Sequence, residues 1–191
     1  MLREDSGTYR RFGPGKPQEV SPYLDLPHTG GEYMAGLERK DRKELKRKFL
    51  RLAEAGYELV EEDNLAEFVR LHRLSDPKKD KFMSEPMAAF FKDVFQAKVP
   101  GWQQQLSFLK INAKYAAGII TFTSADEVWL YNSGYDPQFS YLSVGLLLVA
   151  LDIKRAIEQG KKKYDFQRGA ERYKYELGGR DLQLYKIEIT Q

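Results

Sequence analysis

The start of a helix predicted to begin near Ser143 is the first candidate binding site. Its opening turns, residues 144–150, carry no charged side chain, and charge returns only at Asp152. This half of the helix should be buried, yet the first four N–H groups of any helix lack partners within it. Ser143 can cap one or two of them, Gly145 would let a ligand approach the backbone, and a bound phosphate would satisfy the rest. The alternative is a core helix, capped by Ser143, in which Gly145 serves tight packing.

A second cluster of reactive residue types follows a short predicted strand at 163–166. Acidic, basic and phenolic side chains surround Gly169, namely Asp165, Arg168, Glu171, Arg172, Tyr173 and Lys174. Ligands often bind where the strands of an α/β sheet end. A tyrosine can protonate a departing thiolate, and a lysine or arginine can stabilise an oxyanion or grip a phosphate. The alternative is a surface loop whose charges pair with one another.

Two further features have both functional and structural interpretations. Segment 38–51 holds eight Lys/Arg and three acidic side chains, so it could bind a polyanion or simply be a solvated helix face. His72 lies on a predicted amphipathic helix, and we expect it to be structural rather than a catalytic base.

The composition excludes several classes of site. Without cysteine there is no disulfide, thiolate metal site or cysteine nucleophile, and two histidines are too few for a histidine-rich metal centre. We therefore predict no metal. The apolar run 144–151 is far shorter than the roughly 20 residues that span a membrane. The N-terminus does not resemble a secretory signal, and we expect a cytoplasmic protein without a membrane span.

The elements that must position these residues indicate an α/β sandwich with a mixed sheet. Residues 1–20, rich in Gly and Pro, predict a flexible arm before a single domain over 21–191. Short links predict that the three middle strands form an antiparallel meander. Apolar side chains at 87, 90, 91, 94 and 95 predict a helix with a buried face, and 75–81 reads as a loop. Strands are predicted at 21–26, 57–61, 104–111, 115–123, 128–135, 163–166 and 183–189, and helices at 32–55, 64–74 and 143–159.

Three stretches of this chain resemble the GNAT-like acyltransferase domain of CelD-like proteins, relatives of the FemAB/FemX aminoacyltransferases. They are Tyr23–Leu26 with the basic helix up to Gly56, then Tyr131–Pro137 leading through Ser143–Leu147, and finally Tyr164–Gly169 with Glu171–Lys174 and Gly178. The third is the most specific, because the family usually shows Asp-Phe-Gly-Arg-Gly followed by Glu-x-Tyr-Lys. The resemblance extends over about residues 20–180.

The resemblance implies a GNAT-like fold, with a mixed central sheet of about six to seven strands flanked by helices. It also implies transfer of an acyl group from acetyl-CoA or another acyl-CoA to an amine. In such folds the donor lies where two parallel strands splay apart, and its pyrophosphate rests on the helix that follows. The implied donor-binding residues are Tyr131, Asn132, Ser133, Ser143, Val144, Gly145 and Leu146.

Within this interpretation the second cluster supplies the catalytic groups. We predict Tyr173 as the general acid, Lys174 and Arg168 as holders of the carbonyl oxygen or phosphate, and Asp165 or Glu171 as the acceptor of the amine's proton. No Ser–His or Cys–His pairing is visible, so we expect direct attack by the amine without a covalent enzyme intermediate.

Departures from the family pattern keep alternatives open. Val144 stands where relatives often have Ser-Pro-Gly, Gln167 replaces a usual glycine, and the Gln/Arg-x-x-Gly-x-Gly/Ala phosphate motif of typical GNAT enzymes is absent. FemX-like relatives have two such domains and use aminoacyl-tRNA, which would need the basic face at Arg39–Arg51. A degenerate, non-catalytic binding module is a third interpretation. The usual final strand is missing from the pattern, so a homodimer that exchanges a strand is a further hypothesis.

Overall fold

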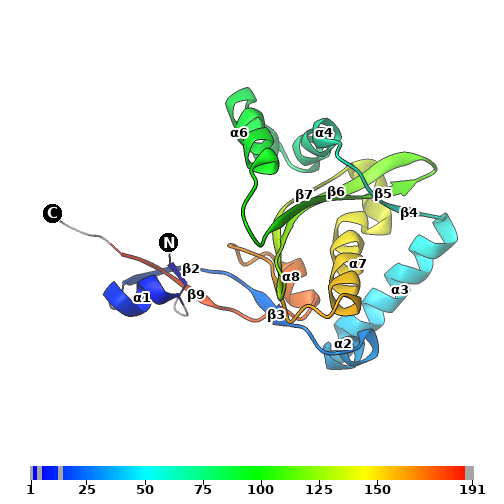
Figure 1. Ribbon diagram of the computed structural model, residues 1–191. Helices are drawn as coiled ribbons and strands as arrows, with labels where there is room; N and C mark the ends of the chain where they lie inside the picture. The colour runs from blue at the N-terminus through cyan, green and yellow to red at the C-terminus, as the bar shows by residue number, and fades with distance from the viewer. Residues whose placement is uncertain (1, 4–5, 13–14, 188–191) are drawn as a thin grey trace.

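The computed structural model describes residues 2–3, 6–12 and 15–187, which form a main body and a projecting arm (Figure 1). The main sheet has six strands in the order β3-β8-β7-β6-β5-β4. Strands β7 and β8 run parallel, and the other neighbouring strands are antiparallel. The mixed sheet and the central meander predicted from the sequence are therefore confirmed. The six strands are β3 (Tyr23–Asp25), β4 (Glu58–Glu61), β5 (Gln103–Ile111), β6 (Lys114–Thr123), β7 (Glu127–Tyr135) and β8 (Lys163–Asp165).

Helices cover both faces of this sheet (Figure 1). On one face α7 and α3 enclose the larger core, which includes Leu52, Leu147 and Tyr164. On the other face α4 and α6 cover a smaller core around Phe68 and Phe108. None of the helices in the described ranges has the length and apolar character needed to cross a membrane. The helices of the body are α2 (Gly30–Gly36), α3 (Arg39–Ala55), α4 (Leu65–Ser75), α5 (Pro77–Phe82), α6 (Glu85–Gln96), the 3-10 helix η1 (Pro137–Leu142), α7 (Val144–Glu158) and α8 (Arg172–Glu176).

One helix prediction and one loop prediction were wrong. The segment 32–55 is not one helix, because the buried Leu37 adopts an extended conformation and separates α2 from α3. The Arg42 guanidinium donates a 2.8 Å hydrogen bond to the Ala35 carbonyl across this break. The predicted loop 75–81 contains α5, because the Asp76 carboxylate accepts from the Lys78 amide at 2.6 Å and Pro77 suits the first helical position.

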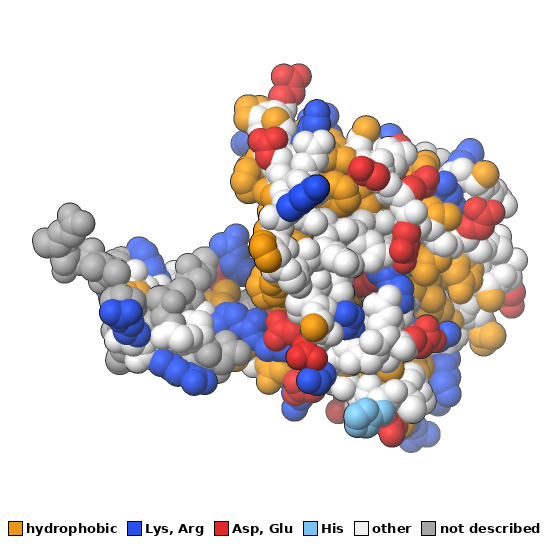
Figure 2. Space-filling model, viewed as in Figure 1, with side chains coloured by type: hydrophobic (Ala, Val, Ile, Leu, Met, Phe, Trp, Pro, Cys, Tyr) orange, Lys and Arg blue, Asp and Glu red, His pale blue; other side chains and the backbone are white. Residues whose placement is uncertain are grey.

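The apolar face of α6 is less covered than its spacing predicts. Phe91 is 3% exposed, whereas Phe90 is 50% exposed. Helix α6 packs toward α4 and the sheet, and the opposite side of the helix faces solvent (Figure 1). Hydrophobic side chains are accordingly visible around α6 in the space-filling view (Figure 2).

The arm consists of α1 (Gly7–Phe12) and a sheet of order β1-β9-β2, formed by β1 (Leu2–Arg3), β2 (Lys16–Val20) and β9 (Gln183–Lys186). It carries Lys and Arg side chains on the surface seen in Figure 2. The last predicted strand, 183–189, thus pairs with the N-terminal segment rather than with the main sheet, and Ile189 lies outside the described residues. Flexibility of residues 1–20 and the single-domain division remain predictions.

Candidate active site

The pairing between strands β7 and β8 ends in the middle of the main sheet. Their parallel pairing runs from Glu127↔Lys163 to Trp129↔Asp165, after which β8 ends and β7 continues to Tyr135. Toward β6, the partners of Ile120 and Thr121 are Asn132 and Leu130, which leaves Tyr131 as an extra residue, a β-bulge. A bulge bends its strand, and this bulge lies two residues after Trp129, the last residue of β7 that pairs with β8.

A cavity of about 290 Å³ lies beside this opening. Its walls come from β7, η1, the start of α7, α5 and α8. Lys79 is the only charged side chain among the described residues that line it. The full lining is Lys79, Ser133, Tyr135, Ser140, Ser143, Val144, Gly145, Leu146, Val149 and Tyr173.

The backbone at the start of α7 leaves N–H groups open beside the cavity. Ser143 is left-handed, with φ +56°, and its side chain makes no capping hydrogen bond. The first helical bond runs from the Leu147 amide to the Ser143 carbonyl, at 3.0 Å. Among the described residues, the amides of Val144, Gly145 and Leu146 have no protein partner. Such a helix end attracts anions through its donors and its dipole.

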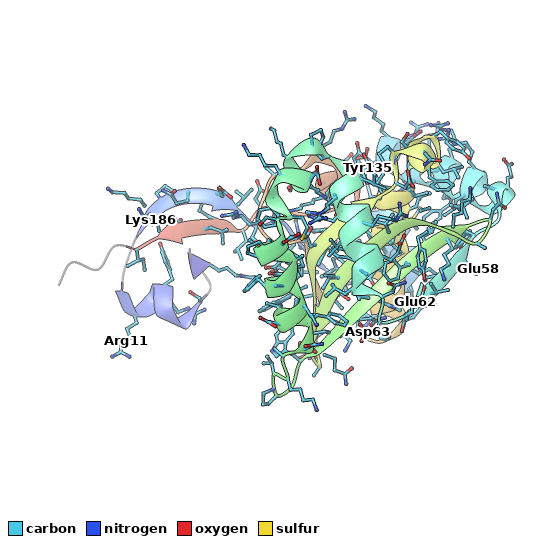
Figure 3. The ribbon with its side chains drawn as sticks, turned by 90° about the horizontal axis from the view of Figure 1, so that it is seen from above. Arg11, Glu58, Glu62, Asp63, Tyr135 and Lys186 are labelled. Carbon is cyan, nitrogen blue, oxygen red and sulfur yellow. The ribbon has the colours of Figure 1, made fainter. Side chains whose placement is uncertain are left out.

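Two glycines allow elements to approach β7 closely. A Cβ on Gly145 would lie 3.3 Å from the Tyr135 ring, so this glycine lets the ring pack against the first turn of α7. Tyr135 lies in the body, far from Arg11 and Lys186 of the arm (Figure 3). A Cβ on Gly134 would lie 2.4 Å from the His72 backbone nitrogen. The glycine at 134 therefore permits α4, and the α5 that follows it, to sit directly on β7.

Lys79 is a cavity residue that the sequence analysis missed. It projects from α5, and its ammonium donates a 2.7 Å hydrogen bond to the Ser133 carbonyl. Burial lowers the pKa of Lys79, while the nearby carboxylates of Asp76 and Glu171 act in the opposite direction. The Asp76-Pro77 pair is a helix-start signal, and it could have revealed the element that carries this lysine.

Tyr173 is the predicted catalytic residue that lines the cavity. Burial raises the pKa of its phenol well above the ordinary value, with a smaller contribution from the Glu171 carboxylate. The hydroxyl therefore stays protonated at neutral and alkaline pH. This is the state that a proton donor requires.

Lys174 closes the loop instead of facing the cavity. The residue is 2% exposed, and its ammonium donates to the carbonyls of Gln167, Arg168 and Gly169, at 2.9, 3.0 and 3.0 Å. It also pairs with Glu171 at 2.9 Å. Burial lowers the pKa of Lys174, against the effect of this pair. With its donors engaged, Lys174 holds the loop in place.

The remaining predicted catalytic side chains also have protein partners and do not line the cavity. Asp165 is fully buried and accepts from the Ser21 hydroxyl at 3.2 Å, from the Gln167 amide at 2.8 Å and from Arg3. Arg168 is exposed and lies 3.2 Å from a Glu19 carboxylate oxygen. For Glu171, burial opposes ionisation, but hydrogen bonds from Lys174 and its own backbone lower the pKa overall.

The predicted donor-binding residues of β7 divide between the two faces of the strand. Ser133 lines the cavity. Tyr131 packs against the rings of Phe91 and Phe122, with centroids 5.5 and 5.2 Å away. The Asn132 side chain accepts a hydrogen bond from the Ser133 amide at 2.8 Å.

His72 belongs to the smaller core. It is 2% exposed and lies near the rings of Phe68, Phe82 and Phe91. Burial, assisted by the Lys79 charge, lowers its pKa to about 4, so it is neutral at physiological pH. Across the described part of the chain, no three His, Asp or Glu side chains come together as a group that could hold a metal ion.

Comparisons with known proteins find a family match and similar folds. Residues 39–175 match the family described as acetyltransferase (GNAT) domain. FemX has a similar structure, with a TM-score of 0.69 and 11% identity over 97% of this chain and 70% of its own. The C-terminal domain of a putative lysylphosphatidylglycerol synthetase from Agrobacterium fabrum has a TM-score of 0.58 and 10% identity, covering 94% of this chain and 63% of that one.

A tandem GNAT protein from the clavulanic acid biosynthesis pathway has a TM-score of 0.52 and 12% identity, over 92% of this chain and 55% of its own. This chain thus spans between about half and 70% of the length of these structures. No curated protein sequence matches it.

Proposed function

We propose that this chain, which belongs to the GNAT acetyltransferase domain family, is an N-acyltransferase that moves an acyl group from acyl-CoA to an amine. The observation that carries the proposal is the set of unpaired amides at the start of α7, which borders a cavity at the opening between β7 and β8. Acetyl is the acyl group that we favour. Closer kinship with CelD-like proteins and a cytoplasmic location remain predictions.

The residues present fit a CoA thioester. The amides of Val144, Gly145 and Leu146 would receive the diphosphate, because they supply donors at the positive end of a helix dipole. Ser133 and Tyr135 on the free part of β7 would border the pantetheine arm. The bound donor would supply an activated thioester carbonyl. The cavity lining offers this group two phenols, Tyr135 and Tyr173, and one ammonium, Lys79.

The proposed reaction is direct attack by a neutral amine on the thioester carbonyl. A C–N bond forms, the C–S bond breaks, and the Tyr173 hydroxyl donates its proton to the departing sulfur. The phenoxide is then reprotonated by the proton that the amine nitrogen loses, through solvent or the Glu171 carboxylate. Lys174, Arg168 and Asp165 support the loop that presents Tyr173, in place of the catalytic roles first predicted for them.

Thermal unfolding with acetyl-CoA and with CoA tests donor binding. A ligand at 100 times its Kd stabilises the fold by about 2.7 kcal/mol, which is easily measured as a shift in Tm. We expect both ligands to stabilise the protein, and acetyl-CoA to lose its acetyl group when a suitable amine is added. Absence of any shift at millimolar acyl-CoA would favour the non-catalytic binding module.

A second candidate donor is aminoacyl-tRNA. A smaller cleft, lined in part by Lys40 and Lys48 of α3 and by Arg172, shares Leu146 with the main cavity. The basic face at Arg39–Arg51 therefore adjoins the proposed phosphate site. Carboxylates of Asp41, Glu44 and Glu176 also line that cleft, which weakens its attraction for a polyanion. Activity that falls steeply with added salt and disappears with ribonuclease would establish the tRNA donor.

A further inference from the structure

The Lys79 ammonium is a cation whose hydrogen bonds are incompletely used. An ammonium has three N–H donors, and the structure gives Lys79 one acceptor, the Ser133 carbonyl at 2.7 Å. No carboxylate of the described residues lies within ion-pair distance of it, in contrast to Lys174, which has Glu171 and three carbonyls. A partly buried charge with unused donors is suited to bind an anion.

The groups around the cavity give it a positive charge. Lys79 is the only charged side chain in its described lining, and the start of α7 adds a positive dipole end. Asp76 and Glu171 act on Lys79 from a distance but do not line the cavity. A ligand bearing an extra positive charge would therefore be repelled, and one bearing a negative charge would be attracted.

The two positive groups reach β7 from opposite faces of the sheet. Helix α7 packs on β6 and β7 from one face, and α4, to which α5 is attached, packs on β7 from the other (Figure 1). Lys79 comes from α5 and ends on the Ser133 carbonyl of β7. The α7 amides account for the donor's diphosphate, so Lys79 remains for an anionic group of the second substrate.

We infer that the acyl acceptor is an amine that also carries a carboxylate or phosphate group, and that Lys79 binds this group. The inference rests on the proposed function and specifies its acceptor class. Simple amines and polyamines would be poor acceptors, because they offer no anion to the ammonium. Lys79 thereby acts as a specificity-determining residue.

Paired acceptors test the inference in the full chain with acetyl-CoA. Glycine is compared with glycinamide, and phosphoethanolamine with ethanolamine, by the release of CoA. We expect the anionic member of at least one pair to have a kcat/KM about tenfold higher or more, mainly because its KM is lower. A tenfold ratio corresponds to about 1.4 kcal/mol. Glycine and phosphoethanolamine also distinguish a carboxylate from a phosphate as the recognised group.

Substitutions assign the preference to Lys79. Lys79→Met should abolish it, Lys79→Arg should keep much of it, and Lys79→Glu should reverse it toward the member of each pair that lacks the anionic group. Lys78→Met, one residue earlier on α5 and exposed, should retain the preference. Stabilisation of each variant by CoA shows that it is folded. Equal use of both members of each pair by the original protein, or an unchanged preference in Lys79→Met, would overturn the inference while leaving CoA binding intact.

Two further results would also overturn it. Weaker binding of acetyl-CoA by Lys79→Met, with unchanged binding of S-acetylpantetheine, would show that Lys79 contacts the donor's phosphates. A stoichiometric acetyl adduct on Lys79 in mass spectra would show that it is a nucleophile. Failure of CoA itself to stabilise the protein would instead remove the proposed function, and this inference with it.

Discussion

The start of α7 and the loop 165–174 were both predicted from residue type to hold the site. The structure shows that they differ in whether their polar groups have protein partners. At the start of α7 the amides of residues 144–146 have no protein partner. In the loop, Asp165, Arg168, Glu171 and Lys174 all bond to other protein groups. One region is open to a ligand, and the other is largely closed on itself.

This difference teaches that charged residue types alone do not identify a site. A carboxylate or ammonium whose hydrogen bonds are complete stabilises the backbone around it, and it has little left for a substrate. The loop nevertheless serves the cavity, because the segment fixed by Lys174 leads directly to Tyr173. Substitutions can therefore separate the supporting residues from those that contact ligands.

The largest expected effect is on stability, at Lys174. Lys174→Met leaves the carbonyls of residues 167–169 without their donor and should lower the free energy of unfolding by about 3–5 kcal/mol. Denaturant titration measures the loss. Arg172→Met is the control, since Arg172 lies on the same helix with its side chain 82% exposed. Equal losses in the two variants would contradict the supporting role of Lys174.

The next effect is on rate, at Tyr173. Tyr173→Phe should lower kcat by about 10²–10⁴-fold while leaving the free energy of unfolding almost unchanged, because it removes only the proton donor. The raised pKa also means that deprotonation of Tyr173 should cause no fall in rate below pH 10. Tyr175→Phe is the matched control, because its hydroxyl bonds to Asp181 at 2.6 Å and does not line the cavity. Full turnover by Tyr173→Phe would remove its assignment as the acid.

A smaller effect is expected on donor affinity, at Gly145. Gly145→Asp places a carboxylate beside the open amides and should weaken CoA binding about tenfold or more, through repulsion and competition for the donors. Gly145→Ala makes the same 3.3 Å contact with Tyr135 without the charge. Calorimetric titration of both variants with CoA separates the effect of the charge from the effect of the contact with Tyr135. If Ala weakens binding as much as Asp, the effect arises from packing rather than charge.

The smallest effect is expected at Arg168. Its exposed pair with Glu19 should contribute less than about 1 kcal/mol, so Arg168→Ala should leave stability and turnover nearly unchanged. Turnover at saturating acetyl-CoA and denaturant titration check this. A large loss of turnover would restore the catalytic role first predicted for this residue.

Much of the fold could be predicted from local patterns. The strand-forming segments of β5, β6 and β7, the short turns between them and the chargeless start of α7 predict the meander and the helix that follows it. The break at Leu37 and the placement of β9 in the arm could not be predicted, since both depend on tertiary packing and pairing. Gly36, just before the break, is compatible with one helix or with two. The apolar residues of the last strand are compatible with pairing in the arm or in the main sheet.

The cavity was predictable only in part. Unpaired amides follow from helix geometry, and Tyr173 follows from its motif. Lys79 could not be placed, because it reaches Ser133 across a separation of 54 residues. The roles of Asp165 and Lys174 depend on partners such as Ser21 and the carbonyls of the loop, and residue type does not reveal whether such partners exist.

Backbone amide NMR spectra during titration with CoA test the central claim most directly. The account predicts progressive shifts of the Val144, Gly145 and Leu146 amide signals, and weaker changes at the amides of residues 167–169, whose carbonyls are held by Lys174. Inorganic pyrophosphate should shift the same α7 signals at higher concentration. Unchanged α7 amides at saturating CoA would contradict the account.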